Sequence, residues 1–258
     1  MATLPTIDLA GIRVSRLIVG GNPFSGGSHQ TAELSREMRD YYTVARIKAT
    51  LRECEAEGID TFLGRADNHI QRMLVECWAE GATLQWIAQT CPERASACDN
   101  LRQAASTGAR IAYLHGGHAD RLVEAGDLDL IREVLEVGRD LGLIMGVAGH
   151  APATHEVIAE QELGAQFHCC SFYHLGGDRG ETYLPEDRDR MLETVQGLRT
   201  PVIGYKIMAA GRNDPEEAFA YAFSRLRPTD AVCVGVFPKH RPHEIRQNAE
   251  LTRRHTEV

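Results

Sequence analysis

The chain has 258 residues, of which 43% are hydrophobic and 25% are charged, and its formal net charge is −8. This composition is typical of a soluble globular protein, and the length is close to that of one complete (β/α)8 barrel. The acidic balance excludes a typical nucleic-acid binder, because the phosphate backbone would be repelled. No run of about 18 apolar residues occurs, so we expect no membrane span, and the N-terminus lacks the pattern of a secretory signal.

The seven cysteines are scattered along the chain, and none forms a Cys-x-x-Cys pair. This usage is typical of reduced thiols in a cytoplasmic protein. We therefore expect a cytoplasmic protein whose partner is a small-molecule substrate, and a homo-oligomer is compatible with the composition.

Short apolar runs alternate with amphipathic stretches from one end of the chain to the other. Strands are predicted near residues 17–21, 59–63, 84–88, 110–115, 143–147, 167–171, 201–206 and 231–235. Helices are predicted near residues 35–56, 69–80, 94–106, 127–141, 152–162, 187–197, 214–226 and 241–254. Alternating elements indicate an α/β fold with a parallel sheet, and eight units predict a single (β/α)8 (TIM) barrel domain over residues 1–258.

Polar side chains recur just after the short apolar runs of the predicted strands. These residues are Asn22, Arg65, Asp67, His69, His115, His150, His168 and Lys206. In a parallel barrel the carboxyl ends of all strands share one face, where such enzymes build their active sites. We therefore expect these side chains to converge on one cavity.

Several of these segments resemble the aldo-keto reductase family. The opening strand of the family is similar to Val14–Leu17 with Gly20-Gly21, and its second strand is similar to Gly58–Phe62. Its fourth strand and histidine resemble Tyr113-Leu114-His115, and its last strand resembles Asp230–Gly235. The resemblance extends over nearly the whole chain and implies an aldo-keto-reductase-like barrel.

The catalytic residues of that family are mostly missing here. Its reductases use an Asp, a Tyr, a Lys and a His beside a nicotinamide, and only the histidine has a clear counterpart, His115. The aspartate position falls on Leu63, the lysine position falls on Gln89 or Thr90, and the tyrosine has no match. Without a phenol to donate a proton, standard carbonyl reduction lacks its acid. The chain therefore resembles the family in fold but not in catalytic residues, and a non-redox reaction is predicted.

The resemblance also bears on NADP. Lys206 replaces the serine that approaches the cofactor pyrophosphate in the family, and an ammonium there can pair with a phosphate. Lys239, His240 and Arg241 stand where the family grips an adenosine phosphate. This trio implies retained dinucleotide binding, and a solvated helix start explains it equally well.

His115 and Lys206 are the residues predicted to act as acid and base. Lys206 follows an apolar strand, and poor solvation would lower the pKa of its ammonium group, although pairing with Asp67 or a phosphate is the alternative. The predicted substrate contacts are Asn22, Arg65, Asp67, His150 and Tyr173, and His174 is a further candidate at the mouth.

A divalent metal is a further hypothesis. Carboxylate and imidazole ligands suit zinc, with manganese as the second choice. The candidate ligands are Asp67, His69, His115, His150 and His168. Because side chains alternate along a strand, only one of His168 and Cys169 can point into the barrel.

Three functions follow from these observations. The first is an isomerase, epimerase or lyase that moves protons next to a carbonyl group of a small sugar-like substrate. The second is a divergent NAD(P)H-dependent oxidoreductase that recruits another acid. The third is a non-catalytic barrel that binds small molecules.

Overall fold

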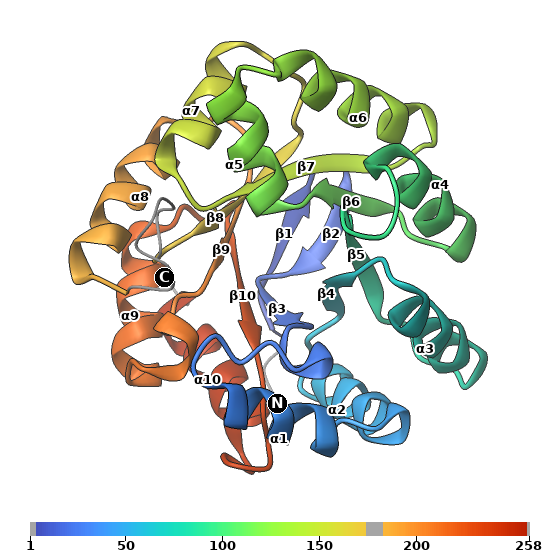
Figure 1. The fold of residues 1–258 in the computed structure, drawn as a ribbon. Coiled ribbons are helices and arrows are strands. Elements are labelled where there is room, and N and C mark those ends of the chain that lie inside the picture. Colours follow the sequence, from blue (N-terminus) through green and yellow to red (C-terminus); the bar gives the residue numbers. More distant parts are fainter. Residues whose placement is uncertain (1–3, 174–182, 257–258) are drawn as a thin grey trace.

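Eight parallel strands close into a barrel in which neighbours follow the order of the chain (Figure 1). The computed structural model describes residues 4–173 and 183–256. The barrel strands are β3 (Leu17–Gly20), β4 (Thr61–Arg65), β5 (Gln85–Gln89), β6 (Ile111–Leu114), β7 (Ile144–Gly149), β8 (Phe167–Ser171), β9 (Val202–Tyr205) and β10 (Ala231–Gly235). β10 pairs with β3 and closes the circle. All eight coincide with predicted strands, so the (β/α)8 prediction is confirmed.

An antiparallel hairpin that the sequence analysis missed precedes the barrel. It consists of β1 (Thr6–Leu9) and β2 (Ile12–Ser15), joined by Ala10 and Gly11, which both have positive φ. Two successive left-handed residues are typical of the tight type I′ turn between short strands. The apolar side chains of the hairpin pack with those inside the barrel, so the hairpin closes its floor.

Helices surround the barrel on the outside (Figure 1). They are α1 (Ala32–Tyr41), α2 (Val44–Ala56), α3 (Asn68–Ala79), α4 (Ala97–Thr107), α5 (Gly116–Ala125), α6 (Leu128–Asp140), α7 (Pro152–Glu160), α8 (Pro185–Gly197), α9 (Pro215–Arg225) and α10 (Glu244–Thr256). The helix predicted over 35–56 is two helices, because Thr43 starts a new one by accepting a hydrogen bond from the Arg46 backbone N–H. Within the described ranges, none of the helices is long and apolar enough to cross a membrane.

Helix α5 was not predicted at all. Its first two residues are Gly116 and Gly117, which read as a loop in the sequence. The helix ends at Gly126, which is left-handed and caps the last turn. The missed helix matters for the site, because it carries Asp120 to the carboxyl end of β7.

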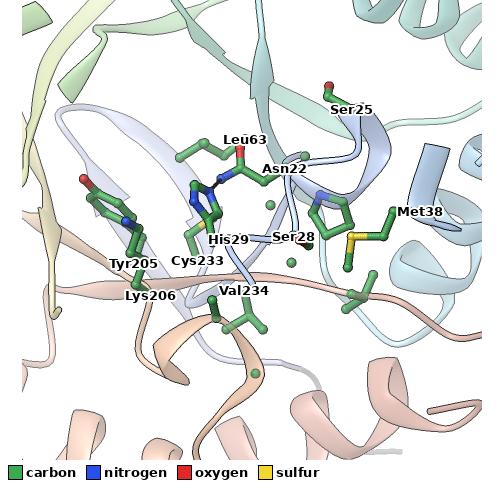
Figure 2. A pocket seen from close by; sticks show the side chains of 18 of the residues that line it. Asn22, Ser25, Ser28, His29, Met38, Leu63, Tyr205, Lys206, Cys233 and Val234 are labelled. Carbon is green, nitrogen blue, oxygen red and sulfur yellow. Dashed lines mark hydrogen bonds between the residues drawn. The ribbon is translucent and has the colours of Figure 1, made fainter. Parts of the chain in front are cut away.

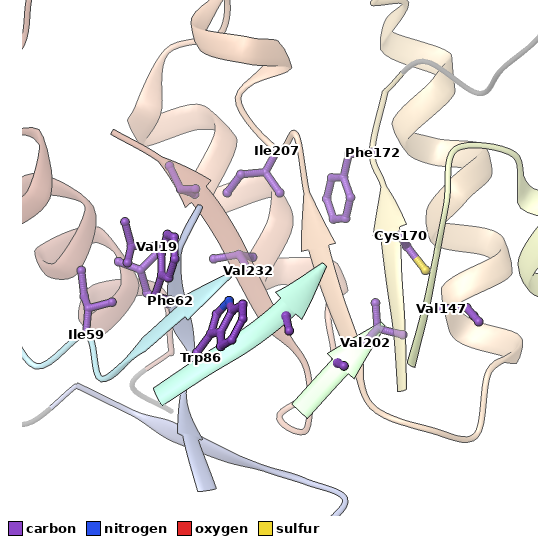
Figure 3. Packing of buried hydrophobic residues seen from close by; sticks show 14 of the residues in the cluster. Val19, Ile59, Phe62, Trp86, Val147, Cys170, Phe172, Val202, Ile207 and Val232 are labelled. Atoms are coloured by element: carbon purple, nitrogen blue, oxygen red, sulfur yellow. The ribbon is translucent and has the colours of Figure 1, made fainter. Parts of the chain in front are cut away.

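Alternation along each strand divides the apolar side chains between two layers. One layer fills the barrel and includes Cys169 and Cys233. The other packs between the barrel and the helices, as Figure 3 shows for Phe62, Trp86 and Cys170. Cys170 faces the helices, and His168, two residues earlier, lies on the same side of the strand. Of His168 and Cys169, it is therefore Cys169 that points into the barrel.

An ion pair with a buried carboxylate ties the amino-terminal end of the barrel together. Asp230, which is fully buried just before β10, accepts two hydrogen bonds from the guanidinium group of Arg227, at 2.9 and 2.8 Å. The same carboxylate accepts the backbone N–H groups of Val202 and Arg227, each at 2.9 Å. The start of β9 is thereby held beside the start of β10.

Replacing Asp230 should therefore test how much this end of the barrel contributes to stability. We expect Asp230→Ala to lower the free energy of unfolding by about 3–5 kcal/mol, because it leaves a partly buried guanidinium and two N–H groups without their acceptor. Urea denaturation followed by circular dichroism measures this change. The control is Glu250→Ala, which breaks an exposed pair with Arg246 and should change stability by less than about 1 kcal/mol. Equal effects of the two variants would contradict this account.

Candidate active site

A cavity of about 830 Å³ opens at the carboxyl ends of the barrel strands. Of the predicted site residues, it is lined by Asn22, Arg65, Asp67, His115, His150, Lys206, His240 and Arg241. Most of the residues proposed from strand ends therefore do converge. The lining contains four arginine or lysine side chains and two carboxylate side chains, so cationic groups outnumber anionic ones.

An imidazole–carboxylate pair lies in the cavity wall. His150 Nδ1 lies 2.8 Å from Asp120 Oδ2, and the His150 backbone N–H also donates to this carboxylate. Thr154 Oγ1 donates to the other oxygen at 2.7 Å. Burial alone would raise the pKa of Asp120, but these hydrogen bonds outweigh it and lower that pKa below its usual value. Because the ionised carboxylate only accepts, His150 Nδ1 must be the donor.

His115 lies next to this pair, at the start of α5. Its backbone N–H donates to Thr90 Oγ1 at 2.9 Å, which holds the end of β6 beside β5. The next residue, Gly116, packs against the His150 ring, and a Cβ there would be only 3.1 Å from His150 Cε1. Burial, and then the charge of His150, lower the pKa of His115 to about 4. His115 is therefore neutral at physiological pH.

Lys206 lines the same cavity, but it belongs to a different part of the rim. β7 and β8 separate the strand of His115 from that of Lys206, so the predicted acid–base partners do not come from neighbouring strands. Lys206 has φ +59°, a left-handed conformation that costs a non-glycine residue of the order of 1–3 kcal/mol. Its ammonium group lies 5.7 Å from the centre of the Tyr183 ring. Strain of this kind is commonly kept where a side chain must be aimed at a ligand.

Residues 22–31, which we call the strap, lie over one side of the cavity. Gln30 Nε2 donates to the Ala210 carbonyl at 2.7 Å, and Arg212 Nη2 donates to the His29 carbonyl at 3.0 Å. The strap thus connects the end of β3 to the loop after β9. Figure 2 shows the His29 ring between Asn22, to which it is hydrogen-bonded, and the Tyr205–Lys206 pair.

Arg65 and Asp67 form an ion pair at the rim of the cavity. Arg65 Nε donates to Asp67 Oδ2 at 3.2 Å, and Arg65 also pairs with Glu93. The other oxygen of Asp67 accepts the Ile70 backbone N–H and caps α3. Arg65 therefore keeps a fixed place at the rim, and Asp67 acts by holding it there. The alternative pairing of Lys206 with Asp67 is not what the structure shows.

The five predicted metal ligands do not form a metal site. His69 is exposed on the first turn of α3, and His168 lies on the outer side of the barrel wall. Asp67 is occupied by Arg65 and by the helix it caps. In the parts of the chain that the structure describes, no group of three His, Cys, Asp or Glu side chains could hold a metal ion. Strand parity and helix position therefore keep His69 and His168 out of the cavity, and the zinc or manganese hypothesis stays a prediction.

Two further predicted contacts, Tyr173 and Lys239, lie away from the cavity lining. Tyr173 is buried, and its hydroxyl oxygen accepts hydrogen bonds from Asn213 and Arg188, so it links helix α8 to the loop before α9. His174 lies outside the described residues. Lys239 is drawn away from the lining to Glu37 on α1, with 2.7 Å between Nζ and Oε1.

Two phenols that the sequence analysis missed line the cavity. Tyr113 donates to Gln89 Oε1 at 2.8 Å, and Tyr205 donates to the Gly149 carbonyl at 3.1 Å. Burial raises the pKa of both hydroxyl groups well above that of a free phenol, so both stay protonated. Tyr205 also packs edge-on against His150, with 5.8 Å between ring centres. Strand parity could have revealed them, because Tyr113 and Tyr205 share the inward side with Cys169.

The protonation of His115 can be measured directly. We expect its imidazole to remain neutral down to about pH 4, because burial disfavours the charged ring. The unfolded chain takes up this proton near pH 6.5, so His115 contributes stability above pH 6.5 that is lost as the pH falls toward 4. ¹⁵N NMR of labelled histidine, with His115→Gln to assign the signal, follows the titration. A midpoint between pH 6 and 7 would contradict the prediction.

Comparison with known proteins agrees on the fold. No protein-family model and no curated protein sequence matches the chain. Among solved structures, a protein from Pseudomonas aeruginosa described as an aldo-keto reductase superposes with a TM-score of 0.66 at 15% identity, covering 97% of this chain and 98% of its own. The glycerol dehydrogenase of Gluconobacter oxydans gives 0.58 at 12% identity, with 98% and 97% covered.

A barrel with a different reaction matches almost as well. Truncated 3-deoxy-D-arabino-heptulosonate 7-phosphate synthase from Thermotoga maritima has a TM-score of 0.58 at 12% identity, covering 98% of this chain and 91% of its own. Reductases and a synthase therefore share the architecture, which leaves the reaction to be argued from the site. The chain has the aldo-keto-reductase-like (β/α)8 barrel that the sequence resemblance predicted.

Proposed function

We propose that this chain is an enzyme that moves a proton at a carbon next to a carbonyl group of a small hydroxylated substrate, as an isomerase, epimerase or lyase does. The observation that carries the proposal is the Asp120–His150 pair in the cavity wall. A carboxylate that holds one nitrogen of an imidazole directs the other as a base and stabilises the imidazolium that forms. Such pairs are a common source of general-base catalysis.

His150 is the base in this proposal, and His115 assists it. Removal of a proton next to a carbonyl places negative charge on the carbonyl oxygen, which requires a hydrogen-bond donor. A neutral imidazole can donate to such an oxygen, and His115 is neutral and adjacent to His150. The start of α5 at Gly116 also lines the cavity, and the positive end of a helix dipole favours the developing charge.

The other rim of the cavity favours a substrate with an anionic group. Lys206 and Arg241 lie on the loops that follow β9 and β10, the seventh and eighth strands of the barrel. Barrels of this class frequently bind phosphate between these two loops. A substrate with a carboxylate or phosphate at one end would place its other end near His150 and His115.

A nicotinamide reductase, the second function considered, fits the described residues less well. The fold family implies NADP, yet the positions of the family's catalytic aspartate and lysine fall on Leu63 and on Gln89 or Thr90. Lys239 and His240, expected to hold an adenosine phosphate, both contact Glu37, at 2.7 and 2.9 Å. A carboxylate at that place repels a phosphate. The residues present therefore do not match the family's cofactor site.

The proposed reaction can be tested before the substrate is identified. We expect incubation in D2O with a panel of small aldoses, ketoses and their phosphates to introduce deuterium at the carbon next to the carbonyl group. Asp120→Asn should slow this exchange by about 10²–10⁴-fold, because the amide neither fixes the same tautomer nor stabilises the imidazolium. ¹H NMR and mass spectrometry measure the exchange.

The matched control is Asp127→Asn, since Asp127 is exposed on the loop after α5 and its side chain makes no capping hydrogen bond. This variant should exchange at the wild-type rate. If no compound of the panel exchanges, or if Asp120→Asn exchanges as fast as the control, the proposed function is wrong. In that case ligand-induced thermal stabilisation without turnover would support the third function, a binding barrel.

Cofactor binding separates the proposal from the reductase. We expect NADPH and NADH to bind with dissociation constants weaker than about 1 mM, because the phosphate-binding side chains are engaged by Glu37. Isothermal calorimetry suits the measurement better than tryptophan fluorescence, since Trp86 packs on the helix side of the barrel wall (Figure 3). Micromolar binding would favour the reductase, and Glu37→Gln should then tighten it further.

A further inference from the structure

Two buried imidazoles lie against each other on the outer side of the barrel wall. His168 belongs to β8 and His155 to α7, and their Nδ1 atoms are 2.9 Å apart. Both residues are almost completely inaccessible to solvent. Buried polar pairs are costly unless their hydrogen bonds are satisfied, so the position of each proton has structural consequences.

The contacts of this pair determine which nitrogens carry protons. His155 Nε2 lies 3.3 Å from the Gly149 carbonyl oxygen, which can only accept, so Nε2 is the donor. Burial lowers the pKa of His155 to about 4 and lowers that of His168 as well, so both rings are neutral. A neutral His155 with a proton on Nε2 must accept at Nδ1, and His168 Nδ1 therefore donates.

The chain of hydrogen bonds continues through Gly149 into the cavity. The carbonyl oxygen that accepts from His155 on the helix side also accepts from the Tyr205 hydroxyl, at 3.1 Å, on the barrel side. The approach of His155 requires glycine at this position, because a Cβ on Gly149 would lie 2.9 Å from His155 Nε2. One backbone oxygen thus accepts a side-chain hydrogen bond from each side of the wall.

We propose that His155 and His168 are positioning residues that hold the Gly149 carbonyl, and through it the Tyr205 phenol, so that Tyr205 accepts a hydrogen bond from a hydroxyl group of the substrate. The inference rests on the proposed function and names its substrate class more closely. A phenol whose proton is given to Gly149 offers only lone pairs to a ligand. Tyr205 lines the cavity beside His150, so the hydroxyl group that it selects lies next to the carbon that loses its proton.

The first experiment reads the phenol itself and needs no substrate. Tyrosine labelled with ¹³C at Cζ reports the hydrogen bonding of each hydroxyl by NMR, and Tyr205→Phe assigns the signal of Tyr205. His155→Met, which cannot donate to Gly149, should shift this signal, whereas His155→Gln retains an N–H donor and should largely restore it. ¹⁵N NMR should show His155 protonated at Nε2 and His168 at Nδ1. An unshifted Tyr205 signal in His155→Met, or the reverse tautomers, would overturn the inference.

A second variant serves as a control for loss of folding in His155→Met. If His155→Met does not fold, the double variant His155→Met/His168→Leu removes both polar rings and leaves no nitrogen unpaired. It should give the same shift of the Tyr205 signal as His155→Met is expected to give. A folded double variant with the wild-type Tyr205 signal would show that the imidazole pair is only structural.

The second experiment uses the compound that exchanges in D2O and its analogue without the hydroxyl group next to the exchanging carbon. In the wild type the analogue should lose about tenfold in kcat/KM, mostly in KM, the effect of one hydrogen bond. Tyr205→Phe and His155→Met should reduce this discrimination, and His155→Gln should keep it. Unchanged discrimination in Tyr205→Phe would refute substrate recognition by the phenol. Failure of the proposed function instead appears as no exchange at all, while the NMR signals still decide whether the pair positions Tyr205.

Discussion

Closure of the barrel imposes one constraint on every strand: successive side chains must alternate between the inside of the barrel and the layer of helices. On β8 this alternation sends Cys169 inward and places His168 against α7. On β6 and β9 it turns Tyr113 and Tyr205 toward the cavity. The chemistry available at the mouth therefore depends on the parity of each residue as much as on its distance from the end of its strand.

The second layer of organisation is the set of short connections that follow the strands. Helix α5 begins immediately after β6, so its second turn brings Asp120 to the backbone and ring of His150 at the end of β7. On the opposite rim the strap and the loop after β9 hold each other through backbone carbonyls. One rim thus carries the His150–Asp120 pair, which is the base of the proposed reaction, and the other carries the cations Lys206 and Arg241. A substrate with a reactive carbonyl at one end and an anion at the other fits this polarity.

The backbone carbonyl of Gly149 connects these layers. It lies between the imidazole pair outside the wall and the phenol inside it, and the next residue is His150. A side chain at Gly149 would collide with His155, so small size at this position is a condition for the whole arrangement. The contact explains why two ionisable rings can be buried far from solvent: each has a hydrogen-bonding partner, and neither carries charge.

The sequence alone determined the eight barrel strands and the class of fold, because apolar runs and amphipathic stretches are local patterns that each strand and helix must carry. It also located His115, His150, Arg65 and Lys206 at one mouth, since parallel strands place their ends together. Only the tertiary structure decided which of these residues act together. Asp120 and His150 are 30 residues apart in the sequence. The helix that carries Asp120 starts with two glycines, which are typical of a loop. His168 and Cys169 were ambiguous because both faces of a barrel strand are buried, so polarity could not assign their sides.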